Sequence, residues 1–229
     1  MNLEERWELM LAWRNLEQRS LDGGFAETLR KVYQDCMTLP PGQRVYPGCG
    51  QDLMRAKYAG WVGLDLREYP RVLPWDLRLG LPFREEHVTE VRVKLTLEFL
   101  SPSQAQFFLN EVARVLELGG RFTLTFRDLE LLLARNNDPG GSVQDRVTLQ
   151  RYLYGSQLYA GGARRSCWVL EQVIDELRRR GLRQRAAPQR SGQLNHTVVV
   201  EKAEERAMKC PRPGRTLKGN RAGDFWGHA

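Results

Sequence analysis

Hydrophobic residues in the first forty positions recur at the spacing of two amphipathic helices. The residues that share a face are Leu3, Trp7, Met10 and Leu11 in the first helix, and Phe25, Leu29, Val32 and Cys36 in the second. The stretch Leu21-Asp22-Gly23-Gly24 breaks the pattern and Pro40-Pro41-Gly42 ends it, because glycine and proline interrupt helices. We therefore predict an N-terminal helical cap over residues 1–40.

Short apolar runs follow from residue 41 to residue 202, separated by turns and by helical patterns. Strands are expected at 44–47, 61–66, around Val72, and at 90–95, 121–126, 182–187 and 197–201. A helix opens at Ser101-Pro102, and we expect Gly119-Gly120 to cap its C-terminus before the next strand. A last helix is expected at 168–180. This alternation of strands and helices predicts an α/β domain over residues 41–202.

Two segments interrupt this alternation. An insertion lies at 128–166, with helices predicted at 129–134 and 143–154 and a turn rich in Asn, Asp, Pro and Gly between them. From residue 203 onward periodicity is lost among prolines, glycines and charges, which predicts a flexible tail over 203–229.

The net charge of +7 is spread unevenly. Residues 202–229 hold seven Lys or Arg against three acids, and a second basic cluster comprises Arg178, Arg179, Arg180, Arg183, Arg185 and Arg190. A basic C-terminal tail can attract nucleic acid or another polyanion through counterion release. The arginines at 178–180 can equally offset the dipole of the helix that they end, so both interpretations stay open.

At 229 residues the chain can bury one core, and no run approaches the ~18 apolar residues of a membrane helix. The N-terminus is mixed in charge and has no secretory apolar core. Cys36, Cys49, Cys167 and Cys210 show no Cys-x-x-Cys spacing, and no two histidines lie at metal-ligand spacing. We expect a cytoplasmic protein with no metal site and no membrane partner.

The strongest chemical signal joins two turns. Gly48-Cys49-Gly50 ends the first predicted strand with little side chain at the bend, so a nucleotide-like ligand can approach the backbone there. Asp65 ends the second strand about fifteen residues later, and its carboxylate can accept hydrogen bonds from both hydroxyls of a ribose. A dinucleotide fingerprint needs a third glycine, and Leu53 stands at that position. A nicotinamide or flavin cofactor is therefore disfavoured.

Further motifs follow in a fixed order. They are Gly60-Trp61-Val62 at a strand start, Asp76-Leu77 before Leu81-Pro82-Phe83, the segment 114–120 before a strand, and Asp128-Leu129-Glu130. Together with the Gly-Cys-Gly loop, this set over residues 43–202 resembles the class I S-adenosylmethionine-dependent methyltransferases, in particular their small bacterial type 11 group. The resemblance implies a Rossmann-like fold with a seven-stranded, mostly parallel sheet, helices on both faces and an antiparallel last strand.

The resemblance also implies S-adenosylmethionine as the cofactor of a methyltransferase, with contacts carried over position by position. These positions are Tyr46, Gly48, Cys49, Gly50, Asp65, Leu66, Asp76, Leu77 and Lys94. The glycine loop would lie beneath the carboxypropyl group and the ribose, and Asp65 would bind the ribose hydroxyls. Asp76 would accept from the adenine amine, and Lys94 or Leu95 would face the sulfonium.

Candidates for contact with the methyl acceptor follow the fourth and fifth strands. They are Glu98, Arg127, Asp128, Tyr154 and Gln157. A carboxylate near the methyl group could act as a base. Asp128 can equally cap the helix that follows it. The acceptor itself cannot be chosen from the fold.

Some positions depart from the family pattern. Tyr46 stands where an acid or asparagine is usual, Leu95 and Phe99 stand where histidines are frequent, and Arg127 stands where proline is frequent. Together with the basic tail, these departures leave a second hypothesis. In it, the chain is a non-catalytic protein with a methyltransferase fold that serves as a binding or assembly subunit for a polyanionic or protein partner.

Overall fold

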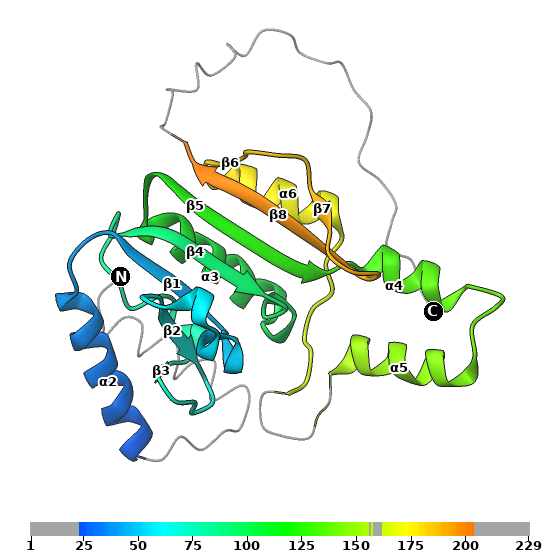
Figure 1. The fold of residues 1–229 in the computed structure, drawn as a ribbon, viewed down its shortest axis with the longest axis horizontal. Helices are drawn as coiled ribbons and strands as arrows, with labels where there is room; N and C mark the ends of the chain where they lie inside the picture. Colours follow the sequence, from blue (N-terminus) through cyan, green and yellow to red (C-terminus); the bar gives the residue numbers. More distant parts are fainter. Residues whose placement is uncertain (1–22, 156, 158–161, 204–229) are drawn as a thin grey trace, which may run out of the picture.

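The computed structural model describes residues 23–155, 157 and 162–203. The first predicted helix and the basic tail lie outside these residues and stay predictions. The described α-helices are α2 (Gly23–Thr38), α3 (Pro102–Val115), α4 (Leu129–Asn136), α5 (Val143–Tyr154) and α6 (Leu170–Arg179). Figure 1 shows α2 at one side of a single sheet and α4 and α5 together beyond the end of β5.

Within the described residues, eight strands form a single sheet in the order β3-β2-β1-β4-β5-β8-β6, with β7 paired to β8. The strands are β1 (Gln43–Pro47), β2 (Val62–Asp65), β3 (Val72–Pro74), β4 (Val88–Lys94), β5 (Leu116–Arg127), β6 (Leu182–Gln184), β7 (Gln189–Arg190) and β8 (Asn195–Lys202). The first five strands run parallel, and β8 runs antiparallel to both β5 and β6. The expected mostly parallel sheet with an antiparallel last strand is confirmed. The two-residue β7 is an addition that the sequence pattern did not indicate.

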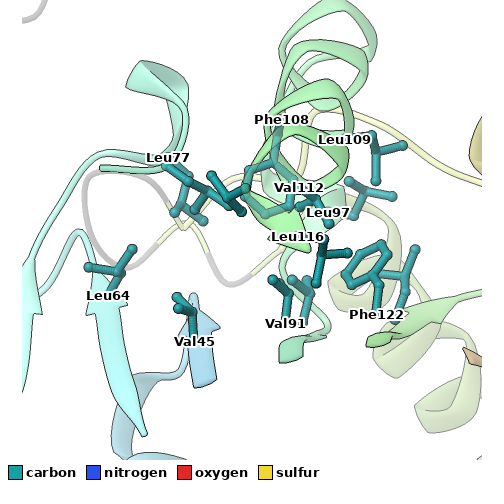
Figure 2. Packing of buried hydrophobic residues seen from close by; sticks show 14 of the residues in the cluster. Val45, Leu64, Leu77, Val91, Leu97, Phe108, Leu109, Val112, Leu116 and Phe122 are labelled. Carbon is teal, nitrogen blue, oxygen red and sulfur yellow. The ribbon is translucent and has the colours of Figure 1, made fainter. Parts of the chain in front are cut away.

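The main core lies on one face of the sheet. Val91 of β4 and Phe122 of β5 are directly paired in register, so their side chains point to the same face of the sheet. Both are fully buried, and Figure 2 shows them below Phe108 and Val112 of α3. Residues of α2 and α6 join the same cluster. Each large apolar side chain buried here contributes about 1.5–3 kcal/mol, so these contacts fix the three helices on the sheet.

The opposite face of β1 packs beneath two 3-10 helices, η1 (Gly50–Met54) and η2 (Ala56–Tyr58). Tyr46 lies there in a smaller apolar cluster with Leu53 and Tyr58. The rings of Tyr46 and Tyr58 meet edge-on, with 5.1 Å between their centroids. This cluster holds the turn after β1 against the sheet.

The predicted glycine C-cap of α3 is wrong. α3 ends at Val115, and Leu116 already has an extended backbone with φ −66° and ψ 133°. Leu116 is fully buried and pairs with Val88 of β4, so strand pairing ends the helix before the glycines are reached. Gly119, at φ +76°, instead lies within β5, where the pairing with β4 shifts register.

Other element boundaries differ by a few residues. α6 begins at Leu170 rather than at 168, because Trp168 forms an isolated bridge with Asp128. β6 ends at Gln184 rather than at 187, and α4 continues to Asn136. α5 has the bounds expected from the sequence. The insertion therefore folds as two helices, as predicted.

Candidate functional site

A cavity of about 260 Å³ lies at the carboxyl ends of β1, β2, β3 and β4. The chain moves outward from β1 to β2 and β3 and then returns to β4 on the other side of β1. Open α/β sheets bind ligands at such a switch point. Six positions that the sequence assigned to a cofactor line this cavity, namely Gly48, Gly50, Asp65, Leu66, Asp76 and Leu77.

The loop after β1 requires glycine at position 48. Gly48 has a φ of +65°, a region that side chains rarely adopt. A Cβ atom there would also collide with the side chain of Thr96. The Gly48 amide donates to the Leu64 carbonyl at 2.7 Å, which fixes the loop beside β2. Gly50 also has positive φ (+49°), but a Cβ atom at Gly50 would meet nothing within 4 Å.

Asp65 is held by two backbone amides. The amide of Gly50 donates to Oδ2 at 2.9 Å, and the amide of Arg67 donates to Oδ1 at 3.0 Å. Both contacts fix the direction of the carboxylate at the edge of the cavity. A carboxylate can accept about four hydrogen bonds, so each oxygen keeps capacity for a ligand hydroxyl.

Asp76 is paired with Arg78. Nε of Arg78 donates to Oδ1 at 3.0 Å, and its Nη2 lies 2.6 Å from Oδ2. The same carboxylate caps the 3-10 helix η3 (Leu77–Leu79) by accepting from the Arg78 amide. Asp76 is only 3% exposed. The hydrogen-bonding capacity of the Asp76 carboxylate is thus largely used within the protein. At this wall of the cavity, the backbone of Leu77 is therefore the group available to a ligand.

Tyr46, Cys49 and Lys94 do not line the cavity. Tyr46 and Lys94 both donate to Oδ2 of Asp52, at 3.2 and 3.1 Å. Burial opposes ionisation of Asp52, but the hydrogen bond and charge of Lys94 outweigh it and lower the pKa of Asp52. Lys94 therefore acts as the counter-ion of Asp52 in this structure.

Cys49 is buried in the cluster beneath η1 and η2. Burial, with the nearby charge of Asp65, raises the pKa of the Cys49 thiol to about 12. The thiolate is the reactive form of cysteine, so Cys49 is not activated as a nucleophile at neutral pH. Its place in the loop is that of a small packing residue.

The cavity has a further wall that the sequence assigned only in part. Leu95, Thr96 and Phe99 follow β4, and Arg165 enters from the segment before α6. The amide of Arg165 donates to the carbonyl of Glu98 at 2.8 Å, which holds this segment at the cavity. Leu95 has a φ of +54°, which is uncommon for a bulky side chain. Its backbone amide donates to the backbone carbonyl of Thr125 at 2.7 Å.

None of the five acceptor candidates lines this cavity. Glu98 lies behind its wall, 2% exposed, and accepts a 2.6 Å hydrogen bond from the Arg127 amide. Burial raises the pKa of Glu98 despite that bond. Tyr154 and Gln157 are exposed. The structure thus brings Glu98 and Arg127 together and leaves Tyr154 and Gln157 on the surface.

Asp128 is the N-cap of α4. Its Oδ1 accepts from the amides of Glu130 and Leu131 at 2.8 and 3.2 Å. Its Oδ2 accepts from the Leu170 amide at 3.0 Å, at the start of α6, and lies 3.3 Å from Nδ1 of His196. One buried carboxylate therefore joins α4, α6 and β8.

Two of the three arginines at positions 178–180 form ion pairs within the protein. Arg180 contacts Glu176 at 2.6 Å and donates to Asn110 of α3, while Arg179 pairs with Asp175 and Glu176. Cations at a helix C-terminus also offset its dipole. This part of the basic cluster thus has a structural role, and the tail beyond it lies outside the described residues.

Two further classes of site were searched for among the described residues. No group of three or more His, Cys, Asp or Glu side chains there could hold a metal ion. In the same part of the chain, no helix combines the length and the apolar character needed to cross a membrane.

Comparison with solved structures finds similar folds. The PH0226 protein of Pyrococcus horikoshii has a TM-score of 0.52 at 19% identity, covering 77% of this chain and 88% of that chain. An S-adenosylmethionine-dependent methyltransferase of Methanosarcina mazei has a TM-score of 0.49 at 12% identity, covering 75% and 97%. A Burkholderia thailandensis 1,6-didemethyltoxoflavin-N1-methyltransferase, solved with S-adenosylhomocysteine, has 0.47 at 15%, covering 87% of each chain.

At these identities the likeness is one of fold. The chain has a Rossmann-like fold of the kind found in class I methyltransferases, with a mostly parallel sheet closed by the antiparallel β8. No protein-family model and no curated protein matches the sequence.

Proposed function

We propose that this protein is an S-adenosylmethionine-dependent methyltransferase. The observation that carries the proposal is the carboxylate of Asp65, fixed by the Gly50 amide at the edge of a cavity at the switch point of the sheet. The ordered motifs of the sequence, which resemble those of class I methyltransferases, support the same cofactor.

The residues around the cavity suit the nucleoside part of this cofactor. Asp65 offers free acceptor capacity to the ribose hydroxyls, and Gly50 leaves open space next to it. Leu66, Tyr69 and Leu77 supply apolar surface for a purine ring. Because Asp76 is paired with Arg78, we assign recognition of the adenine edge to the backbone of Leu77 rather than to the Asp76 carboxylate.

S-adenosylmethionine supplies an already activated methyl group, so the protein must chiefly align the reactants and exclude water. We assign this task to Leu95, Phe99 and Leu100, apolar residues at the wall that β4 and η4 (Leu97–Phe99) provide. Among the described residues of that wall, the charged side chain is Arg165, whose guanidinium group is a hydrogen-bond donor and not an acceptor. Alignment, rather than proton transfer, is the contribution that we expect from it.

The test is a comparison of two carboxylate deletions on one loop. Asp65→Ala should weaken binding of S-adenosylhomocysteine about 10- to 150-fold, the loss of about 1.5–3 kcal/mol expected for charge-assisted hydrogen bonds. Glu68→Ala is the matched control, because Glu68 is exposed and does not line the cavity. Equal affinity in the wild type and both variants, measured by calorimetric titration, would reject the assignment of Asp65.

A further inference from the structure

A second cavity of about 250 Å³ lies between α4, α5 and the start of β8. Arg127, Arg135 and Asp145 line it together with Tyr152 and Asn195. It shares no lining residue with the cavity assigned to the cofactor. One water needs only ~10–15 Å³ of such space, so this cavity has room for an organic molecule of several atoms.

Arg127 is the most buried charge in this cavity, only 9% exposed. Its guanidinium carbon lies 3.9 Å from the centre of the Tyr152 ring. Nε donates to the side-chain oxygen of Asn195 at 3.3 Å, whereas Nη1 is buried without a hydrogen-bond partner. Stacking engages the face of a guanidinium and leaves its N–H edge for an acceptor.

The charges around Arg127 do not balance. Arg135 is paired with Asp138 at 2.9 Å and with Asp145 at 3.4 Å, so neither acid is available to Arg127. Burial and then the charge of Arg164 lower the pKa of Arg127, and the charge of Glu98 opposes this shift without outweighing it. Glu98 accepts from the Arg127 amide, and burial raises the pKa of this carboxyl group, which favours its neutral form.

Two neighbouring cations beside one acid leave a buried charge only partly compensated, which is costly unless an anion joins them. We propose that this second cavity binds a small organic carboxylate, held at the N–H edge of Arg127. The planar fork of arginine matches a carboxylate in two parallel hydrogen bonds. Leu149 and Leu194, also in the lining, provide apolar surface for the organic part. This site is independent of methyl transfer.

The test uses benzoate as the probe and benzamide as its neutral isostere, with calorimetric titration of the full chain in the absence of cofactor. Benzoate should bind, and benzamide should bind at least about tenfold more weakly, because only the carboxylate forms a charge-assisted pair with Arg127. Inorganic phosphate should compete less well than benzoate. Tighter binding of phosphate would overturn the assignment to an organic acid.

Two variants locate the probe. Arg127→Gln removes the charge, and Thr148→Phe fills the cavity from α5 while every charged group stays in place. Both should weaken benzoate binding at least about tenfold. Val147→Phe is the matched control for the second variant, because Val147 lies on the same helix, is 39% exposed and does not line the cavity.

Asp65→Ala, in the other cavity, should leave benzoate affinity unchanged, so a failed cofactor assignment and a failed carboxylate site are distinguishable. If Arg127→Gln does not fold, the benzoate affinity of Thr148→Phe shows whether the probe binds in this cavity. Absence of benzoate binding to the wild type, or unchanged affinity in Thr148→Phe, would overturn the proposal.

Discussion

The amide of Gly50 donates a 2.9 Å hydrogen bond to Oδ2 of Asp65, across fifteen residues of sequence. The bond joins the turn after β1 to the end of β2. It gives the carboxylate a fixed direction at the cavity edge, because the second oxygen is held in turn by the Arg67 amide. A ligand that binds Asp65 therefore meets a group whose orientation has already been set.

Gly48→Ala should destabilise the fold more than Gly50→Ala does. Both glycines have positive φ, which costs a substituted residue about 1–2 kcal/mol, but only a Cβ atom at position 48 would collide with Thr96. We expect a loss of about 2–4 kcal/mol for Gly48→Ala and about 1–2 kcal/mol for Gly50→Ala in urea denaturation. Equal losses would show that the contact with Thr96 is not limiting.

Asp76→Ala should act on stability through Arg78. The variant leaves a largely buried guanidinium without its paired carboxylate, and breaking such a pair costs about 3–5 kcal/mol. The double variant Asp76→Ala/Arg78→Met should recover part of this loss, because it also removes the buried charge that Asp76 had paired. A double variant less stable than Asp76→Ala alone, measured by chemical denaturation, would argue against this coupling.

Asp128→Ala should also destabilise the protein, by about 2–3 kcal/mol, since it removes the cap of α4 and the hydrogen bond to the start of α6. Affinity of the folded protein for S-adenosylhomocysteine should stay unchanged, because Asp128 does not line that cavity. Asp128→Asn, which keeps one acceptor oxygen, is the conservative control. A specific loss of affinity with stability intact would instead place Asp128 in the binding site.

Glu98→Gln should stabilise the protein at neutral pH and flatten its pH dependence. Burial raises the pKa of Glu98 above its ordinary value of 4.5, so the folded state binds more protons than the unfolded state. The contribution of Glu98 to stability is therefore fully present below pH 4.5 and is lost as pH rises toward the raised pKa.

The glutamine variant stays neutral throughout that range. A gain of about 1 kcal/mol would raise the melting temperature by about 2–4 °C in a chain of this size. Melting curves of both proteins from pH 4 to pH 8 check this expectation. Parallel pH profiles of the two proteins would show that Glu98 does not titrate as described.

The placement of Asp65 beside Gly50 could be expected from the sequence, because the carboxyl ends of neighbouring parallel strands meet at one edge of a sheet. The resemblance carried by the ordered motifs also implied a mostly parallel sheet with an antiparallel last strand, which the structure has. The bounds expected for α5 after the turn at 137–141 are those of the structure, where Ser142 caps the helix in a hydrogen-bonded capping box. These features depend on local sequence and on topology.

The remaining features depend on contacts that local sequence does not contain. Arg165 reaches the cavity from a segment far along the chain, through a backbone hydrogen bond to Glu98. The end of α3 was missed because pairing of Leu116 with Val88 outweighs the glycine signal. The resemblance implies that Lys94 or Leu95 faces the sulfonium, and of the two only Leu95 lines the cavity. Lys94 instead donates to Asp52 of η1 at 3.1 Å, and the sequence pattern did not indicate η1.

The most direct test of the proposed function is calorimetric titration of the wild-type chain with S-adenosylhomocysteine. We expect saturable binding of one molecule per chain with a micromolar dissociation constant. Absence of binding by a chain that melts cooperatively would contradict the cofactor assignment and leave the non-catalytic hypothesis for this fold.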